Sequence, residues 1–277
     1  MIARALGLPR LRFNAIFGGI VVSLIIAIAM LSPWLAPHDP MRLNLVARMA
    51  PIGGEYWLGT DEFGRDVLSR LMMGARTSAW IAFSTVLFAL VTGTIFGVLS
   101  GFLRGWADRI IMMFNDAFLA FPGLLLALGF MAVFGASRNG IIIALGLAYM
   151  PVVVRVVRST VMSIREREFV EASRVTGNSE IVTMFRHVLP NCVAPVTVLA
   201  TTMFGWIILS ESALSFLGLG VPPPAPSWGN MLSTARPYIN QAPHLIILPG
   251  LCISITLLGV NMLGDAVRDW LDPKMQG

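Results

Sequence analysis

The chain contains a single lysine, Lys274, although Lys and Arg together number 20. A P-loop that binds nucleotide phosphates needs a lysine directly after its GxxxxG turn. The surroundings of Lys274, DPKMQG, form no such turn. The sequence therefore excludes a Walker-type ATPase site in this chain.

Histidine and cysteine are scarce too, which removes the common metal and hydrolase motifs. His38, His187 and His244 form no HExxH pattern and no close pair, and neither CxxC nor GxSxG occurs. Cys192 and Cys252 adjoin or lie within apolar runs, so we expect small buried side chains and no disulfide. We expect no catalytic site, no metal site and no cofactor bound by the chain itself.

Charge is low as well, at 13% of the 277 residues, whereas soluble domains carry about 25%. Hydrophobic residues make up 56%, and several apolar runs approach the roughly 20 residues that cross a bilayer as a helix. We therefore predict an all-α integral membrane protein. The apolar runs and the Gly and Pro residues between them place about six transmembrane helices, at 13–35, 78–103, 113–134, 140–158, 193–217 and 245–265.

The arginines indicate how these spans are oriented, because basic residues concentrate on the cytoplasmic side. With a cytoplasmic N-terminus, thirteen basic residues fall inside and seven outside, five of the seven in the long loop 36–77. Both termini are therefore predicted to be cytoplasmic. The apolar run 15–31 is expected to be a retained first span and not a cleaved signal peptide.

Two outer segments join the spans, at 36–77 and 219–244. From Asp66 onward the apolar residues of the first segment fall on one helical face, which predicts an amphipathic helix at the outer surface leading into the second span. We divide the chain into 1–77, the first helix with its outer loop, and 78–277, the core with a cytoplasmic loop at 155–192. Pro122 and Pro151 are expected to kink their helices.

Charged side chains within spans are costly and usually functional. Asp116, Asp265 and Arg268 lie near predicted membrane surfaces, where snorkelling or pairing with an arginine accounts for them. Glu211, near the outer end of the fifth span, leaves two interpretations open. It either makes a structural pairing or lines a path or outer gate through the membrane.

The loop 155–192 is long, polar and rich in helix formers. Residues 166–176 form one predicted arm, which Gly177 ends with a left-handed cap. Asn178 or Ser179 caps a second arm, and Pro190 marks the turn towards the fifth span. Both arms are amphipathic and too short to be stable alone, so they need a surface to pack on, either the chain's own bundle or a partner.

The same loop carries a pattern that resembles the EAA motif of permease subunits of type I ABC importers: Glu171, Ala172, Ser173, Gly177, Leu189 and Pro190. That motif reads EAA, three residues, Gly, nine residues, Ile, one residue, Leu-Pro. Here Ser173 stands in place of the second Ala and His187 in place of the Ile, with the spacing kept. Longer stretches resemble the second, C-type permease subunit of the dipeptide/oligopeptide/nickel family: LGTDEFGRDVLSRLMMGAR at 58–76, LSFLGLGVPPPAPSWGNML at 214–232 and LGDAVRDWLDP at 263–273.

The resemblance implies the type I importer permease fold in a bacterial inner membrane, with a cytoplasmic coupling helix that docks on an ATP-binding subunit. The residues it assigns to this coupling loop are Phe169, Glu171, Ala172, Ser173, Gly177, Ile181, Leu189 and Pro190. It also implies four kinds of partner: a second homologous permease, two ATPase subunits that use ATP and Mg²⁺, an extracytoplasmic substrate-binding protein and the lipid bilayer. It implies no nucleic acid.

The substrates implied are di- and oligopeptides, with nickel or a nickel chelate, glutathione and other small solutes as alternatives. Trp57, Trp228 and Tyr238 in the outer segments are candidate contacts for the binding protein, or else interfacial aromatics at headgroup depth. A rival hypothesis from another class is a secondary transporter driven by an ion gradient. It predicts mid-membrane acids or a discontinuous helix pair.

Overall fold

The computed structural model of the chain describes residues 2–271, with side chains described for 13–270. Within that range the chain is helical apart from loops and two isolated β-bridges. Five helices there are long and apolar enough to cross a membrane, or six if one sharply bent pair counts as a single span. This confirms the predicted all-α membrane fold with about six spans. Lys274 lies outside the described residues.

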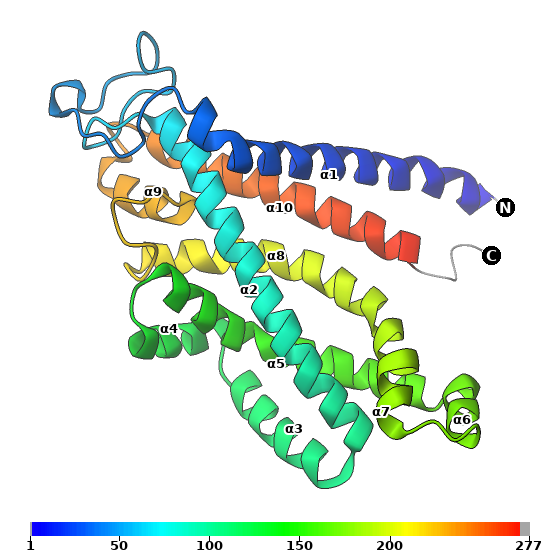
Figure 1. The fold of residues 1–277 in the computed structure, drawn as a ribbon. Coiled ribbons are helices and arrows are strands. Elements are labelled where there is room, and N and C mark those ends of the chain that lie inside the picture. The colour runs from blue at the N-terminus through cyan, green and yellow to red at the C-terminus, as the bar shows by residue number, and fades with distance from the viewer. Residues whose placement is uncertain (1, 272–277) are drawn as a thin grey trace.

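The long helices lie alongside one another in a bundle (Figure 1). Helix α1 packs along α10 and α2, α2 packs most extensively on α5, and α8 contacts α10, α2 and α5. The long loop after α1 and the short helix α9 lie at one end of the bundle. Helices α6 and α7, the start of α1 and the end of α10 lie at the other. The bounds of these five long helices are α1 Ile2–Leu35, α2 Val67–Leu103, α5 Arg138–Arg165, α8 Val193–Phe216 and α10 His244–Leu271.

A row of small residues holds α2 against α5. Gly93, Gly97 and Gly101 recur every four residues along one face of α2 and touch α5 directly. A Cβ atom built on Gly97 would lie 2.7 Å from Cβ of Val157, closer than real Cβ contacts allow. Small residues at this spacing let two membrane helices approach closely and gain van der Waals contact. The largest helix–helix contact of the fold therefore depends on glycine.

Helix α2 differs from the prediction at its start. It runs unbroken from Val67 to Leu103, so the separate amphipathic helix expected at the outer surface is wrong. Ser69 and Arg70 lie on the polar face of the predicted amphipathic helix, yet both are buried, because their polar groups are bonded to the preceding loop. The boundary placed after residue 77 falls inside this continuous helix.

The third predicted span is two helices, α3 (Gly105–Leu119) and α4 (Gly123–Phe134), whose axes differ by 98°. The predicted kink at Pro122 is thus much sharper than expected, and α3 begins eight residues earlier than the predicted 113. Pro122 lacks an N–H, and it restricts the backbone of the residue before it, so the helix ends at this point. Pro151, in contrast, lies inside the continuous helix α5.

The remaining elements are short. The loop 36–66 holds one 3-10 turn, Leu45–Ala47. The segment 217–243 holds α9 (Trp228–Ala235) and a 3-10 turn, Arg236–Tyr238. Between α5 and α8 lie α6 (Glu168–Val175), α7 (Glu180–Thr183), a π-helical turn η2 (Met184–Val188) and a 3-10 turn η3 (Leu189–Cys192).

Candidate functional site

The segment that bears the EAA pattern, residues 166–192 and hereafter the EAA segment, begins with helix α6. Gly177 ends this helix with φ of +88°, the left-handed conformation predicted for it. The N–H groups of Gly177 and Asn178 donate to the carbonyls of Arg174 and Ser173, at 3.0 and 3.2 Å. This pair of bonds is a Schellman cap, which satisfies the free carbonyls of the last helical turn. Ser179 then caps α7, its Oγ accepting from the N–H of Val182.

The two arms meet at a buried polar contact. The hydroxyls of Ser173 and Thr183 lie 3.1 Å apart, and Nδ2 of Asn178 donates to the Ser173 hydroxyl at 3.1 Å. Nε of Arg174 and Oε1 of Glu180 form an ion pair of 3.0 Å above it. The arms are therefore locked to each other across the turn, and the EAA segment forms one compact knob.

The opposite face of the knob is open. Glu171, Ala172 and Gly177 are exposed, whereas Ser173 is buried. Large apolar side chains are exposed beside them: Phe169, Val175, Ile181, Val182 and Phe185. Isolated amphipathic arms of this length are unstable without a packing partner. The exposed apolar and acidic residues are therefore those available for a partner, at the end of the bundle remote from the loop 36–66 (Figure 1).

The second arm departs from the regular helix that was predicted. After four residues α7 widens into the π-helical turn η2 and then tightens into η3, which leads straight into α8. The ring of His187, which is half-buried at the position where the motif has Ile, lies 6.4 Å from the exposed ring of Phe169. Leu189 is half-buried and Pro190 is exposed in η3. π-Turns inside helices occur frequently at functional sites.

Glu211 lies near the far end of α8 and joins it to the start of α9. Its Oε1 accepts hydrogen bonds from Ser215 of α8, at 2.9 Å, and from Ser227, at 2.8 Å. Ser227 in turn caps α9 through a reciprocal capping box with Asn230. The Glu211 side chain is 1% exposed. These contacts are of the structural kind, with serine hydroxyls in place of an arginine, and the second interpretation, a path or outer gate, stays a prediction.

Trp228, the first residue of α9, is 3% exposed and faces the bundle. Its indole N–H donates to the carbonyl of Leu71 at 3.1 Å, and its backbone N–H to the hydroxyl of Ser78 at 3.1 Å. Its predicted role as a surface anchor for a binding protein is therefore wrong in this structure: it fastens α9 to α2. Trp57, at 68% exposure, and the partly exposed Tyr238 remain at the surface.

The loop 36–66 is fixed to the start of α2 by buried charges. Arg65 and Arg70 lie 2.7 and 3.3 Å from the carboxylate of Asp61, and Arg65 lies 3.5 Å from Glu62. Burial of the Glu62 side chain raises the pKa of its carboxyl above the ordinary value. Asp66 caps α2, accepting from the N–H and the hydroxyl of Ser69. The motif TDEFGRD is thus a buried turn held by ion pairs and hydrogen bonds, and not a solvated one.

A family model described as the inner membrane component of binding-protein-dependent transport systems matches residues 93–277. A second, described as the N-terminal transmembrane domain of oligopeptide transport permease C, matches residues 14–51. The chain belongs to this family of permease subunits. The permease thereby has its EAA segment and most of its spans inside the first match, and α1 with the start of its following loop inside the second.

Characterised relatives are similar to the permease over most of their length. It is 42% identical to the dipeptide transport system permease protein DppC of Alkalihalophilus pseudofirmus, over 95% of this chain and 86% of that protein. It is 43% identical to the di/tripeptide transport system permease protein DppC of Pseudomonas aeruginosa, over 95% and 89%. It is 39% identical to the glutathione transport system permease protein GsiD of Pectobacterium atrosepticum, over 95% and 87%.

Solved structures show the fold. The permease resembles a chain of the inward-facing MetNI methionine ABC transporter with a TM-score of 0.61 and 18% identity, over 73% of this chain and 96% of that one. It resembles an amino acid ABC transporter with histidines with a TM-score of 0.56 and 13% identity, over 73% and 94%. The predicted type I importer permease fold is confirmed.

Charged residues within the spans of the permease pair across helices. Asp116 of α3 contacts Arg155 of α5 at 2.7 Å, the arginine pairing expected for it. Asp108 makes two hydrogen bonds to Arg158, at 2.6 and 2.7 Å, and one to Ser100, a cluster that the sequence did not reveal. Asp265 and Arg268 are exposed on the last turns of α10.

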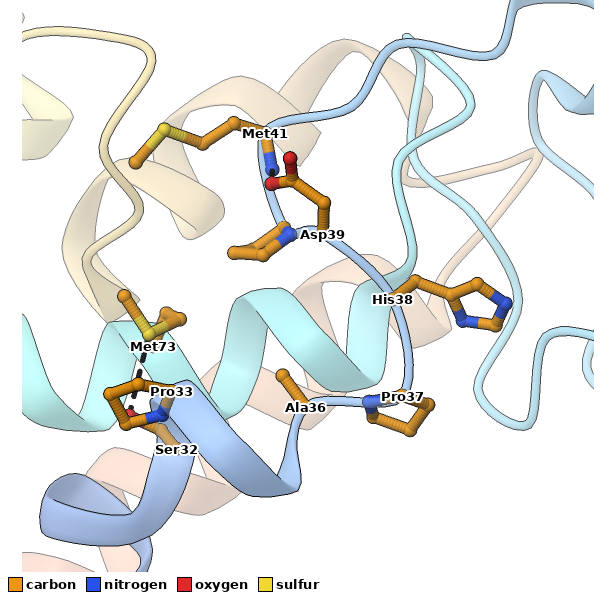
Figure 2. Close-up of a pocket in the computed structure, with 9 residues that line it drawn as sticks. Ser32, Pro33, Ala36, Pro37, His38, Asp39, Met41 and Met73 are labelled. Carbon is orange, nitrogen blue, oxygen red and sulfur yellow. Dashed lines mark hydrogen bonds between the residues drawn. The ribbon is translucent and has the colours of Figure 1, made fainter.

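An open cavity of about 470 Å³ lies where α1 ends, beside α2 (Figure 2). Ser32 of α1 donates to the sulfur of Met73 at 3.4 Å on its floor, and the prolines of 33–40 form much of its rim. The side chain of His38 points away from this floor, and the cavity presents few polar groups (Figure 2). It therefore offers no convergent set of ligands for a small polar molecule.

Proposed function

We propose that this permease forms half of the translocation pore of an ATP-driven importer of short peptides. The other half is a second, homologous permease chain. Two ATPase subunits dock on the EAA segment, and a substrate-binding protein delivers peptide at the opposite end. The chain itself binds no cofactor, and ATP and Mg²⁺ are used by the ATPase subunits. Both termini lie in the cytoplasm, together with the EAA segment.

The observation that carries this proposal is the construction of the EAA segment. Ser173, Thr183 and Asn178 stiffen it from inside, while Phe169, Glu171 and Ile181 stand on its open face. A rigid knob with an exposed apolar face transmits a push to the helices on either side, α5 and α8, which a flexible loop would not. Because the permease has no P-loop of its own, this face is the place where an ATP-hydrolysing partner would apply force.

The proposed orientation follows from the same placement. The EAA segment, the start of α1 and the end of α10 share one end of the bundle (Figure 1), which agrees with the predicted cytoplasmic arginines. The loop 36–66 and the segment 217–243 then face outward and form the surface for the binding protein. Trp57 and Tyr238 remain candidate contacts there, while the buried Trp228 fastens α9 to α2.

Peptide as substrate is supported by the relatives, two of which are named for dipeptides or di- and tripeptides. Glutathione, for which a third is named, is itself a tripeptide, so the shared chemistry is a short peptide with charged ends. Nickel or its chelates and other small solutes remain alternatives. Family membership argues against an ion-gradient carrier, although the bent pair α3 and α4 is a feature that such a carrier would also present.

The decisive experiment isolates the complex in mild detergent through a tag on this chain and identifies its components by mass spectrometry. A co-purifying ATPase with a Walker lysine and a second hydrophobic permease would support the proposal. The complex is then placed in proteoliposomes with its binding protein, and uptake of a dipeptide, a tripeptide, glutathione and Ni²⁺ is measured with and without ATP. Uptake by this chain alone, without ATP, would overturn it.

A further inference from the structure

The exposed face of α5 differs in kind from that of its neighbour α2. On α2 the exposed row is apolar throughout: Trp80, Phe83, Leu87, Val91 and Ile95. On the second half of α5 the exposed row reads Val152, Arg155, Ser159 and Ser163, which helical periodicity places on one face. An apolar row suits lipid or a packed partner helix, whereas a row of Arg and Ser suits water.

Arg155 is paired but not covered. Its Nη2 lies 2.7 Å from Oδ1 of Asp116, yet the side chains remain 59% and 57% exposed. The neighbouring pair, Asp108 with Arg158, is 19% and 27% exposed and has Ser100 as a further partner. Both pairs connect α3 to α5. The pair of Asp116 and Arg155 is mostly exposed, whereas the pair of Asp108 and Arg158 is mostly buried between the helices.

Arg155 lies near the inner end of the predicted span 140–158, although it is well inside the helix α5. It stands 17 residues after Arg138, about 26 Å along the helix, and 10 residues before Arg165, about 15 Å from the other end. Gly93 and Gly97 of α2 touch Val153 and Val157, so Arg155 lies level with Ile95. An exposed charge inside a span is costly in hydrocarbon, even near the inner end, and such residues face a water-filled cavity or the interior of an assembly.

We propose that Asp116 and Arg155 line the inner mouth of the water-filled path and form a transient binding site for the charged ends of a peptide in transit. A peptide carries an ammonium group and a carboxylate, which match Asp116 and Arg155 in charge. Guanidinium binds carboxylate through two parallel hydrogen bonds, and exchange of one ion pair for two keeps every charge paired. The site rests on the proposed function and adds the place where the substrate is held.

The first test asks whether this face meets water, and it does not depend on the substrate. In a chain with Cys192→Ala and Cys252→Ala, single cysteines are introduced as Val152→Cys and Ser159→Cys, on either side of Arg155. Ile95→Cys on the apolar row of α2 is the control at the same depth. A charged thiosulfonate reagent is applied to open membrane fragments holding the whole complex, with and without MgATP, so that both conformations are sampled.

We expect Ser159→Cys and Val152→Cys to react, in at least one nucleotide state, much faster than Ile95→Cys. Added dipeptide should slow the reaction at Ser159→Cys. If both introduced cysteines are as unreactive as Ile95→Cys in every state, the row is covered by lipid or protein and the inference is overturned.

The second test separates binding of peptide ends from a merely structural ion pair. We expect Arg155→Gln to raise the half-saturating concentration for a dipeptide with a free carboxylate about tenfold, which is the loss expected when one charge-assisted hydrogen bond is removed. The C-amidated form of the same dipeptide should be little affected. Asp116→Asn should discriminate in the same way between free and N-acetylated peptides. The enclosed pair provides the control, since Asp108→Asn should affect all peptides equally.

If Arg155→Gln affected free and amidated peptides equally, the ion pair would be purely structural and the proposed binding site would be overturned. Failure of the proposed function looks different. In that case the wild-type complex takes up no peptide in either form, while the labelling at Ser159→Cys still reports on the path.

Discussion

The hydroxyl groups of Ser173 and Thr183 lie 3.1 Å apart in the buried junction between the two arms of the EAA segment. They belong to α6 and α7, which are also joined by Asn178 and by the ion pair of Arg174 with Glu180. In the proposed coupling, a force applied to the exposed face of α6 would pass to the second arm, and so to α8, through these contacts and the turn between them. This junction is therefore the contact on which the proposed coupling between α6 and α8 depends.

We predict that this hydrogen bond can be dissected by a double-mutant cycle. Ser173→Ala leaves the buried Thr183 hydroxyl without its partner, and Thr183→Val does the reverse, each at a cost of about 1–3 kcal/mol. The double variant removes both hydroxyls and should recover part of the loss, because Asn178 still lacks the acceptor that Ser173 provided. Hydrogen–deuterium exchange of residues 168–183 in the intact complex measures this, and strictly additive protection losses would contradict the direct bond.

Gly177 yields a second prediction, because its φ of +88° is unfavourable for other residues while the space around its missing Cβ is empty. Gly177→Asn should be nearly neutral, since Asn tolerates the left-handed region, and Gly177→Ala should cost about 1–2 kcal/mol. Gly177→Asp adds a charge to the docking face and should abolish uptake while membrane insertion stays intact. Uptake assays and membrane fractionation distinguish these outcomes, and wild-type uptake by Gly177→Asp would refute the coupling role.

The features that the sequence predicted correctly are local ones. Apolar length located the spans, and the left-handed cap at Gly177 and the helix cap at Ser179 follow from the chemistry of one or two residues. The sharp break at Pro122 was anticipated as a kink, but its angle of 98° depends on how α4 packs on α5 and could not be derived from proline alone.

The features that the sequence missed depend on distant partners. Trp228 was read as a surface anchor, yet its partners Ser78 and Leu71 stand 150 and 157 positions earlier in the chain. Arg70 lies on the polar face of the predicted amphipathic helix, yet it is buried and bonds to Asp61 and to the carbonyl of Pro40. A polar residue in an outer segment looks the same in a sequence whether it meets solvent or a buried counter-charge.

The glycine row of α2 predicts that a larger residue at one of these positions destabilises the fold. Gly97→Leu must push α5 away, because even a Cβ at this position would lie 2.7 Å from Cβ of Val157. Overpacking of this kind costs about 1–3 kcal/mol or more. The thermal midpoint of the purified complex should fall clearly, whereas Gly19→Ala on α1, whose Cβ would meet nothing within 4 Å, should leave it unchanged. An unchanged midpoint for Gly97→Leu would show that α2 and α5 separate freely.

Glu62 gives a prediction about pH. Burial holds the pKa of its carboxyl above the ordinary 4.5, so the folded state binds the proton more tightly than the unfolded state. The contribution of this group to stability is therefore most favourable below pH 4.5 and declines as pH rises through the raised pKa. Glu62→Gln, which cannot ionise, should match the wild-type thermal midpoint near about pH 4 and exceed it near about pH 7.5. A difference that stays constant across this range would contradict the buried, hard-to-ionise carboxyl.

Glu211 offers the sharpest separation between a structural and a transport role. Its Oε1 accepts from Ser215 and Ser227, and the latter caps α9, so the side chain connects α8 to the segment 217–243. Glu211→Gln keeps an acceptor oxygen at this position and should retain both the thermal midpoint and uptake. Glu211→Leu removes it, leaves two buried hydroxyls without their acceptor at about 1–3 kcal/mol, and should free the 217–243 segment to proteolysis. If Glu211→Gln instead lost uptake at an unchanged thermal midpoint, the negative charge itself would be required, and Glu211 would belong to the gate after all.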